Sequence, residues 1–193
     1  IKWPDGHDSI IPTSKILECG ASRYPDYKFW SKKFTPNRFT WKDFLDDVST
    51  SIEALKDLVS YGVIILKEAP KELNSLEMLS KRLGPIHETL FERINNVSIT
   101  GHVYNVAHTS KGLPPHNDFA SYKSQPSIQA LHMLENECEG GESIIVDGWR
   151  LLEDLRYDRP DFFKTLQDFD VPFREFDEEN ETFAEAPIIK CSN

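Results

Sequence analysis

A histidine and an aspartate that stand two positions apart carry the first chemical signal in this sequence. His116 and Asp118 occur in "GLPPHNDFASY", directly after a pair of prolines. In an extended segment, residues at positions i and i+2 point to the same side, so both side chains can reach one point while Asn117 faces away. An imidazole and a carboxylate together suit iron, manganese or zinc, so this pair is a candidate for part of a metal site.

The spacing alone leaves more than one interpretation open. Two histidines and one carboxylate with open coordination positions serve non-heme iron oxygenases, but His116 and Asp118 in a surface loop would instead make local hydrogen bonds. His102 and His108 could join His116 in a zinc cluster, although no helical His-x-x-x-His spacing supports it. His132 lies in an apolar segment and is expected to be a hydrogen-bonded core residue.

Motifs for other catalytic classes are absent from the sequence. It contains no Gly-x-Ser-x-Gly, no P-loop and no Gly-x-Gly-x-x-Gly, so neither that type of serine nucleophile nor nucleotide binding is supported. The three cysteines, Cys19, Cys138 and Cys191, are far apart and form no Cys-x-x-Cys pair. This favours reduced thiols in an intracellular compartment over a disulfide framework or an all-cysteine zinc site.

The composition is that of a folded, soluble protein. A length of 193 residues suits one domain, and 39% hydrophobic with 28% charged residues is ordinary for a globular chain. A net charge of -10 without a cluster of Lys and Arg argues against a nucleic-acid partner. No apolar run approaches the ~20 residues that span a bilayer, and "IKWPDGHDS" lacks the apolar core of a signal peptide. We expect no membrane association and a cytoplasmic location, with mitochondria as the alternative.

The first half of the chain predicts helices around a short strand. Residues 1–40 are rich in aromatics and prolines without a sustained period, which indicates a connector or the end of a small preceding module. Over residues 41–61, apolar side chains recur every three or four positions and predict one or two amphipathic helices that end at a glycine. "VIILKE", residues 63–68, predicts a buried strand. Ser75 is expected to cap a further helix that ends at Gly84.

The second half of the chain predicts mainly strands. Apolar and β-branched runs between turn residues predict strands over residues 97–106, 127–134, 142–148 and 171–176, and periodic apolar residues predict helices over 149–155 and 160–169. The acid-rich residues 177–185 are expected to form a solvated loop. Helices followed by strands indicate an α+β domain whose core is a mostly antiparallel sheet, with a barrel as one form of it.

Several motifs in a fixed order resemble those of a known family. "AHTSKGLPPHND", "QALH", "GGESIIVDG" and "VPFR" follow one another within the densest part of the resemblance, residues 104–174. Together they resemble the γ-butyrobetaine and trimethyllysine hydroxylase branch of the taurine-dioxygenase-like superfamily, whose members are iron(II)- and 2-oxoglutarate-dependent oxygenases. The resemblance covers about residues 1–191. It implies a double-stranded β-helix (jelly-roll) core with flanking N-terminal helices, in a domain of residues 41–193.

The resemblance also implies roles for individual residues. His116 and Asp118 would be two of the three iron ligands. The cosubstrate 2-oxoglutarate would be contacted by Ser143, Leu131 and Asn105. The substrate-binding residues would be Asn105, His108, Phe91, Asn95 and Phe119.

The implied reaction acts on a small polar metabolite such as an amino acid or a betaine-like compound. It consumes 2-oxoglutarate and O2, releases succinate and CO2, and hydroxylates the metabolite, with desaturation and cyclisation as variants. Enzymes for γ-butyrobetaine hold a trimethylammonium group between aromatic faces. The corresponding positions here fall near Phe91, Asn95 and His108, so most of the aromatic character is lost and a quaternary amine is disfavoured. A homodimer is compatible with the resemblance.

Two features of the family are not found in this sequence. The third iron ligand would be a later histidine followed by an arginine for the far carboxylate of 2-oxoglutarate, and we expect both outside these residues. "IKWPDGHDS" resembles the end of a small zinc domain, with His7 at the position of a zinc ligand. Its cysteine partners would lie upstream, so structural zinc is expected only together with residues that are absent here.

One main hypothesis and two alternatives follow. The main hypothesis is an iron(II)/2-oxoglutarate oxygenase with His116 and Asp118 as ligands. The first alternative is a catalytically inactive homologue that serves as a binding module. The second is a zinc hydrolase that uses His116, Asp118 and another histidine.

Overall fold

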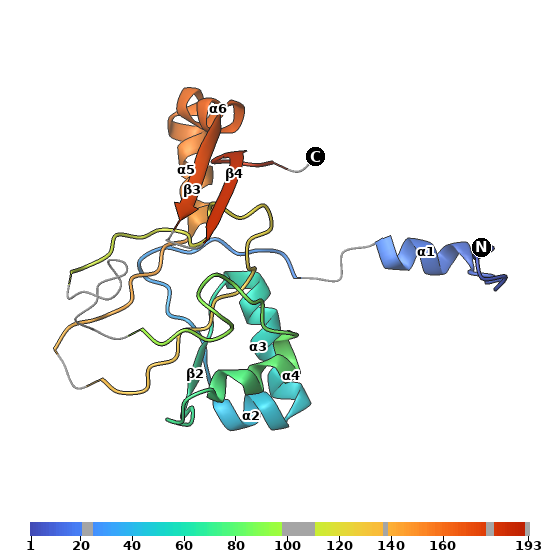
Figure 1. Cartoon of the computed structure of the whole chain (residues 1–193), viewed down its shortest axis with the longest axis horizontal. Helices are drawn as coiled ribbons and strands as arrows, with labels where there is room; N and C mark the ends of the chain where they lie inside the picture. The colour runs from blue at the N-terminus through green and yellow to red at the C-terminus, as the bar shows by residue number, and fades with distance from the viewer. Residues whose placement is uncertain (21–24, 98–110, 137–138, 177–179, 192–193) are drawn as a thin grey trace.

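The computed structural model describes residues 1–20, 25–97, 111–136, 139–176 and 180–191, and most of its helices and strands form two groups (Figure 1). The first group contains β1 (Arg38–Thr40), α2 (Trp41–Asp46), α3 (Val48–Tyr61), β2 (Ile65–Lys67), the 3-10 helix η1 (Ser75–Leu79) and α4 (Ser80–Leu83). The second contains α5 (Gly148–Asp158), α6 (Pro160–Asp168), β3 (Asp170–Phe176) and β4 (Glu181–Pro187). Helix α1 (Thr13–Gly20) stands apart from both groups.

Helices α2 and α3 confirm the prediction of one or two amphipathic helices over residues 41–61. Thr40 begins α2, because its hydroxyl accepts a hydrogen bond from the backbone N–H of Asp43. Asp47 ends α2 and caps α3 through a carboxylate that accepts from Thr50 N–H at 2.8 Å. Phe44 is 0% exposed in the cluster that these helices bury. That core consists of Trp41, Phe44, Leu45, Ala54 and Leu79.

The predicted strand at residues 63–68 is confirmed as the shorter β2, but its predicted burial is wrong, since Ile65 and Leu66 are half-buried and Lys67 is exposed. It pairs in parallel with β1, with Phe39 opposite Leu66, and both side chains pack on the core of the first group. Gly62 ends α3 in the left-handed conformation, at φ 75°, as predicted from its position after the last periodic residue. A side chain there would be strained by this φ and would contact the ring of Tyr27.

The helix predicted after Ser75 exists, but the predicted cap is wrong. Ser75 is the first residue of η1, and its hydroxyl donates to the carbonyl of Glu72 at 2.7 Å. The preceding Asn74 holds a left-handed φ of 67° and makes no side-chain capping bond. The segment therefore starts as a tight 3-10 turn and becomes α-helical only at Ser80, before it ends at Gly84 as predicted.

The second group confirms the predicted helices and the strand at residues 171–176. Asp147 caps α5, Pro160 opens α6, and β3 pairs with β4 in an antiparallel ladder. The prediction of a solvated loop over residues 177–185 is wrong from Glu181 onward, because β4 begins there. Its acidic side chains face solvent while Ala184 faces inward, so the acid-rich composition is that of the outer face of an amphipathic strand.

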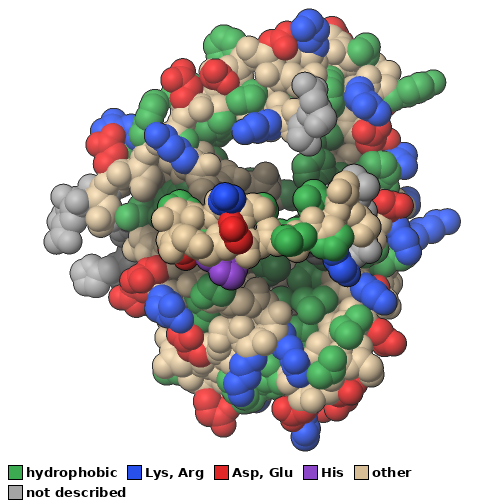
Figure 2. Space-filling model, turned by 90° about the vertical axis from the view of Figure 1, so that its right-hand side faces the viewer, with side chains coloured by type: hydrophobic (Ala, Val, Ile, Leu, Met, Phe, Trp, Pro, Cys, Tyr) green, Lys and Arg blue, Asp and Glu red, His purple; other side chains and the backbone are tan. Residues whose placement is uncertain are grey.

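The predicted strands at residues 127–134 and 142–148 are wrong in the described residues, which are irregular there. Large apolar side chains of both segments are exposed, including Leu131, Met133 and Ile144. A strand needs a hydrogen-bonding neighbour, and β-branched composition alone does not supply one. Hydrophobic side chains also lie exposed among charged ones on the face drawn in Figure 2. Gly140 and Gly141, which precede the second of these segments, both hold a left-handed φ, at 89° and 77°.

The described residues have the mixed helix and strand content of the predicted α+β class. Their paired strands form two separate two-stranded sheets rather than one large sheet. The predicted strand at 97–106 falls almost entirely on residues 98–110, outside the described part. Among the described residues, no helix combines the length and apolarity that a bilayer crossing requires.

Candidate functional site

The His116 and Asp118 side chains point to one another, as the i and i+2 spacing predicted. Nε2 of His116 lies 3.3 Å from Oδ1 of Asp118, and the two side chains are 51% and 44% exposed. Two adjacent ligands of an octahedral ion, each about 2.1 Å from the metal and at right angles, would be about 3 Å apart. The observed separation therefore fits a pair of ligands on one cation.

The imidazole of His116 has a defined tautomer. Its Nδ1 lies 2.8 Å from the carbonyl oxygen of Pro114, and a carbonyl can only accept, so Nδ1 carries the proton. The lone pair of a neutral imidazole is then on Nε2, the atom that faces Asp118. Histidines that bind metals commonly donate their other N–H in this way, which fixes the ring and makes it a stronger ligand.

The carboxylate of Asp118 has one oxygen engaged and one oriented toward His116. The side-chain amide of Gln129 donates to Oδ2 of Asp118 at 2.7 Å. Because a carboxylate only accepts, the amide nitrogen rather than its oxygen must face Asp118. Oδ1 is therefore the oxygen that faces a cation position beside His116.

The segment that carries His116 and Asp118 is attached to the rest of the protein through the residues that follow Asp118. The hydroxyl of the buried Ser121 lies 2.7 Å from the Thr182 hydroxyl of β4 and donates to Glu175 of β3 at 3.3 Å. The ring hydroxyl of Tyr122 accepts from the N–H of Leu90 at 3.0 Å. The irregular chain around His116 and Asp118 is therefore held between β3, β4 and the residues near 90.

An aromatic cluster lies immediately after Asp118. The ring of Phe119 is 6.0 Å from that of Phe91 and 4.9 Å from that of Tyr122, measured between centroids. Phe119 holds a positive φ of 60°, which is costly for a residue with a side chain, and its carbonyl accepts from Tyr122 N–H at 3.0 Å. The structure thus brings together Phe91 and Phe119, two of the predicted substrate-binding residues.

The other predicted site residues that the structure describes are exposed. Leu131 is 71% exposed, Ser143 is also exposed in an irregular segment, and Asn95 is an exposed residue. Asn105 and His108, together with His102 of the alternative zinc cluster, lie outside the described residues. Within the described residues, no three His, Cys, Asp or Glu side chains gather where they could hold a metal ion.

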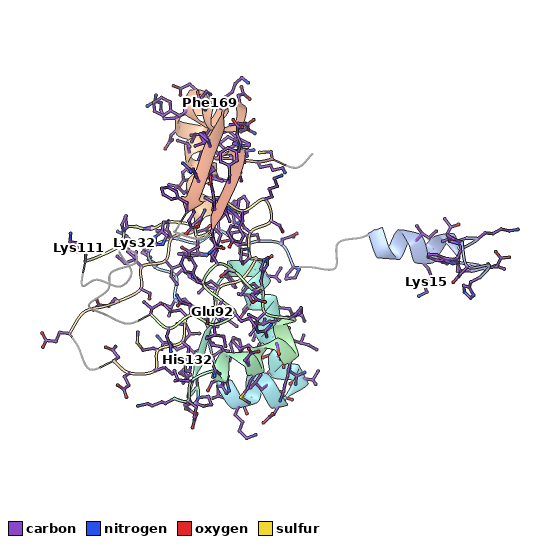
Figure 3. The ribbon with its side chains drawn as sticks, in the orientation of Figure 1. Lys15, Lys32, Glu92, Lys111, His132 and Phe169 are labelled. Atoms are coloured by element: carbon purple, nitrogen blue, oxygen red, sulfur yellow. The ribbon has the colours of Figure 1, made fainter. Side chains whose placement is uncertain are left out.

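His132 is placed against the core, as predicted, but not hydrogen-bonded as predicted. Its ring stacks on that of Trp41 with centroids 6.2 Å apart and planes at 17°. Nε2 of His132 is buried with no hydrogen-bond partner among the described residues. Figure 3 shows His132 beside the part of the fold that holds α2 and β2. The residue anchors its segment through ring stacking instead.

His7 lies in a small turn of the N-terminal segment. Its backbone N–H donates to Asp5 Oδ1 at 3.0 Å, and its carbonyl accepts from Trp3 N–H at 2.8 Å. The role of His7 in a zinc site stays a prediction.

Two residues of the site were not predicted from the sequence. Gln129 was visible only as part of the "QALH" motif, two positions before Leu131, and no spacing rule connects it with Asp118. Tyr122 is an aromatic residue shortly after Asp118 in the sequence, and no sequence pattern predicts its contact with Leu90. Both contacts join residues that are far apart in sequence.

Comparisons with known proteins identify the family to which the chain belongs. The sequence profile of the family described as "Taurine catabolism dioxygenase TauD, TfdA family" matches residues 27–192. A γ-butyrobetaine dioxygenase of Pseudomonas sp. (strain AK-1) is 29% identical over 98% of this chain and 52% of its own length. The human γ-butyrobetaine dioxygenase is 26% identical over 90% of this chain and 48% of its own length.

A trimethyllysine dioxygenase, the second type of enzyme in the predicted branch, is also similar to this chain. The human mitochondrial trimethyllysine dioxygenase is 23% identical over 85% of this chain and 41% of its own length. The chain thus spans about half the length, or less, of these three curated relatives. The matches confirm the predicted resemblance to the γ-butyrobetaine and trimethyllysine hydroxylase branch. Since the family profile covers most of its residues, the chain belongs to the taurine catabolism dioxygenase TauD, TfdA family.

Proposed function

We propose that the protein is an iron(II)- and 2-oxoglutarate-dependent oxygenase that hydroxylates a small polar metabolite, such as an amino acid or a betaine-like compound. The observation that carries this proposal is the 3.3 Å approach of His116 Nε2 to Asp118 Oδ1 in a chain of this family. In the balanced reaction, one C–H of the metabolite, O2 and 2-oxoglutarate give the alcohol, succinate and CO2. Desaturation and cyclisation are variants that the same site could support.

His116 and Asp118 would hold the metal. Iron(II), when bound, supplies the redox chemistry that couples decarboxylation of 2-oxoglutarate to oxidation of a C–H bond. The hydrogen bond from His116 Nδ1 to Pro114 keeps the ring oriented, with Nε2 facing Asp118. The reaction further requires a second histidine ligand, which the intact protein must supply.

The cosubstrate would lie beside this pair. We propose that Ser143 donates a hydrogen bond to a carboxylate of 2-oxoglutarate, that Leu131 covers its carbon chain, and that Asn105 contacts both cosubstrate and substrate. Leu131 is exposed, which is consistent with a surface that a ligand would cover.

The aromatic cluster of Phe91, Phe119 and Tyr122 would form one wall of the substrate site. Its rings meet directly after Asp118, so a substrate held against them would be close to the metal. Asn95 and His108 would add polar contacts. A wall of phenyl and phenol rings with polar groups beside it suits a small metabolite that has both an apolar and a polar end.

We also propose that residues 1–40 end a small N-terminal module and that residues 41–193 contribute to a double-stranded β-helix. Zinc would bind near His7 only with cysteines from elsewhere in the protein. A homodimer and a cytoplasmic or mitochondrial location are part of the same proposal.

The test measures succinate formed from 2-oxoglutarate by the intact protein. The proposal requires that formation depend on both iron(II) and O2, and that His116→Ala abolish it while Asn117→Ala retains it. A protein that binds neither iron(II) nor 2-oxoglutarate would instead be the inactive binding module. Turnover of an ester or amide with zinc in the absence of O2 would identify the hydrolase.

A further inference from the structure

The side chain of Gln129 contacts the one oxygen of Asp118 that does not face His116. The amide nitrogen lies 2.7 Å from Oδ2, and Gln129 comes 11 positions after Asp118 in the chain. A carboxylate can bind a cation through one oxygen or through both. With Oδ2 engaged by an amide, only Oδ1 is directed at the position that a cation beside His116 would occupy.

The number of oxygens through which Asp118 binds a metal ion determines how many coordination positions stay open for other ligands. A two-oxygen carboxylate would occupy two of the six positions around an octahedral ion, whereas a one-oxygen carboxylate occupies one. The proposed reaction needs positions for both ends of the 2-oxoglutarate keto acid and for O2. A side chain that keeps Asp118 to one oxygen therefore keeps a position open.

The segment that carries Gln129 packs on the protein core a few residues further along the chain. His132, three residues later, stacks on Trp41, which is 5% exposed at the start of α2. Asp118 is anchored independently, through Ser121, to β3 and β4. The hydrogen bond between Gln129 and Asp118 thus joins two segments that are attached to different groups of secondary structure.

We propose that Gln129 is a positioning residue that holds Asp118 as a one-oxygen metal ligand. This inference rests on the proposed function. Gln129 would not touch the cation or the reacting atoms, and would act through the orientation of the Asp118 carboxylate. Outer partners of this type commonly change metal affinity by about 10- to 100-fold when they are removed.

The test compares metal binding by the intact protein, by three glutamine variants and by His116→Ala. Gln129→Leu removes the amide at nearly constant size, and Gln129→Asn withdraws it by one methylene. Gln125→Leu is the matched control, an exposed glutamine in the same segment. Mn(II) affinity is measured by competition with a fluorescent chelator, and the coordination of Co(II) is read from its visible absorption spectrum. Circular dichroism establishes that each variant is folded.

The expected result is a loss of about 10-fold or more in Mn(II) affinity for both Gln129 variants, with a changed Co(II) spectrum. Gln125→Leu should match the unaltered protein in both readouts. If Gln129→Leu and Gln129→Asn bind Mn(II) as tightly as the unaltered protein with the same Co(II) spectrum, the positioning role is refuted while the proposed function stands. If the unaltered protein does not bind Mn(II) in a manner that His116→Ala abolishes, the proposed function fails and this inference fails with it.

Discussion

The hydroxyl group of Tyr27 donates a hydrogen bond of 3.0 Å to the carboxylate of Asp147, across 120 positions of sequence. Asp147 is 5% exposed and also accepts from the backbone N–H groups of Trp30 and Arg150, at 2.8 and 3.0 Å. One buried carboxylate thus caps α5 and fastens the N-terminal segment to it. A buried charge is tolerated when several donors satisfy it, and here three groups do so.

Tyr27→Phe should destabilise the protein, because the Asp147 carboxylate would keep its burial and lose one donor. We expect a loss of about 1 to 2 kcal/mol in the free energy of unfolding, measured by urea denaturation. Tyr157→Phe is the matched control, since that tyrosine is 88% exposed, and it should change stability by less than about 0.5 kcal/mol. Equal effects of the two substitutions would contradict the role assigned to Tyr27.

The same contact predicts a pH dependence at alkaline pH. Burial, and then the hydrogen bond to Asp147, raises the pKa of Tyr27 to about 12. The folded state therefore holds this proton more tightly than the unfolded chain, whose tyrosine pKa is about 10. The stability contribution is complete below pH 10 and is lost as the pH rises toward 12. Urea denaturation between pH 9 and about pH 11.5 should show a steeper decline for the unaltered protein than for Tyr27→Phe.

Phe44→Ala should be the most damaging single truncation in the first group of elements. Phe44 is 0% exposed within the cluster formed by α2, α3 and η1, so its removal leaves a cavity. We expect a loss of about 3 to 5 kcal/mol, read from chemical denaturation. Phe169→Ala provides the control, because Phe169 is exposed where α6 ends, as Figure 3 shows. A small effect at both positions would mean that Phe44 is not part of a packed core.

Mn(II) should raise the thermal unfolding temperature of the unaltered protein. A ligand at 100 times its dissociation constant stabilises the folded state by about 2.7 kcal/mol. His116→Ala and Asp118→Ala should abolish this shift, because each removes one of the two atoms that lie 3.3 Å apart. Asn117→Ala, which alters the residue between them, should retain it. An unchanged shift in both ligand variants would place the metal elsewhere in the protein.

Phe119→Gly should weaken substrate binding without weakening metal binding. Glycine accepts the positive φ of 60° at this position, so the ring is removed without adding backbone strain. Aromatic contacts of this kind contribute about 0.5 to 1.5 kcal/mol, which corresponds to a rise in KM of up to about 10-fold. Phe183→Ala, at an exposed position of β4, is the control. A fall in Mn(II) affinity for Phe119→Gly would instead indicate that Phe119 supports Asp118.

Local sequence patterns predicted correctly those parts of the structure that depend on contacts between residues a few positions apart. The helices over residues 41–61 follow from apolar periodicity and from the caps Thr40 and Asp47, whose hydrogen bonds reach only three positions along the chain. The same applies to His116 and Asp118, which converge because their spacing is two. The predictions of strands at 127–134 and 142–148 were wrong, because a strand requires a neighbouring strand to pair with. Local composition does not specify that neighbour.

The sequence by itself determined the family, through the order of its motifs, and the identity of the paired imidazole and carboxylate. Tertiary structure alone decided which oxygen of Asp118 faces His116, because Gln129 reaches Oδ2 from another segment. It also decided that acid-rich residues after 180 form a strand, since β3 lies alongside them. The physical reason is the same in both cases. Hydrogen bonds between separate segments depend on how the chain packs in three dimensions, and the spacing of residues within one segment does not predict that packing.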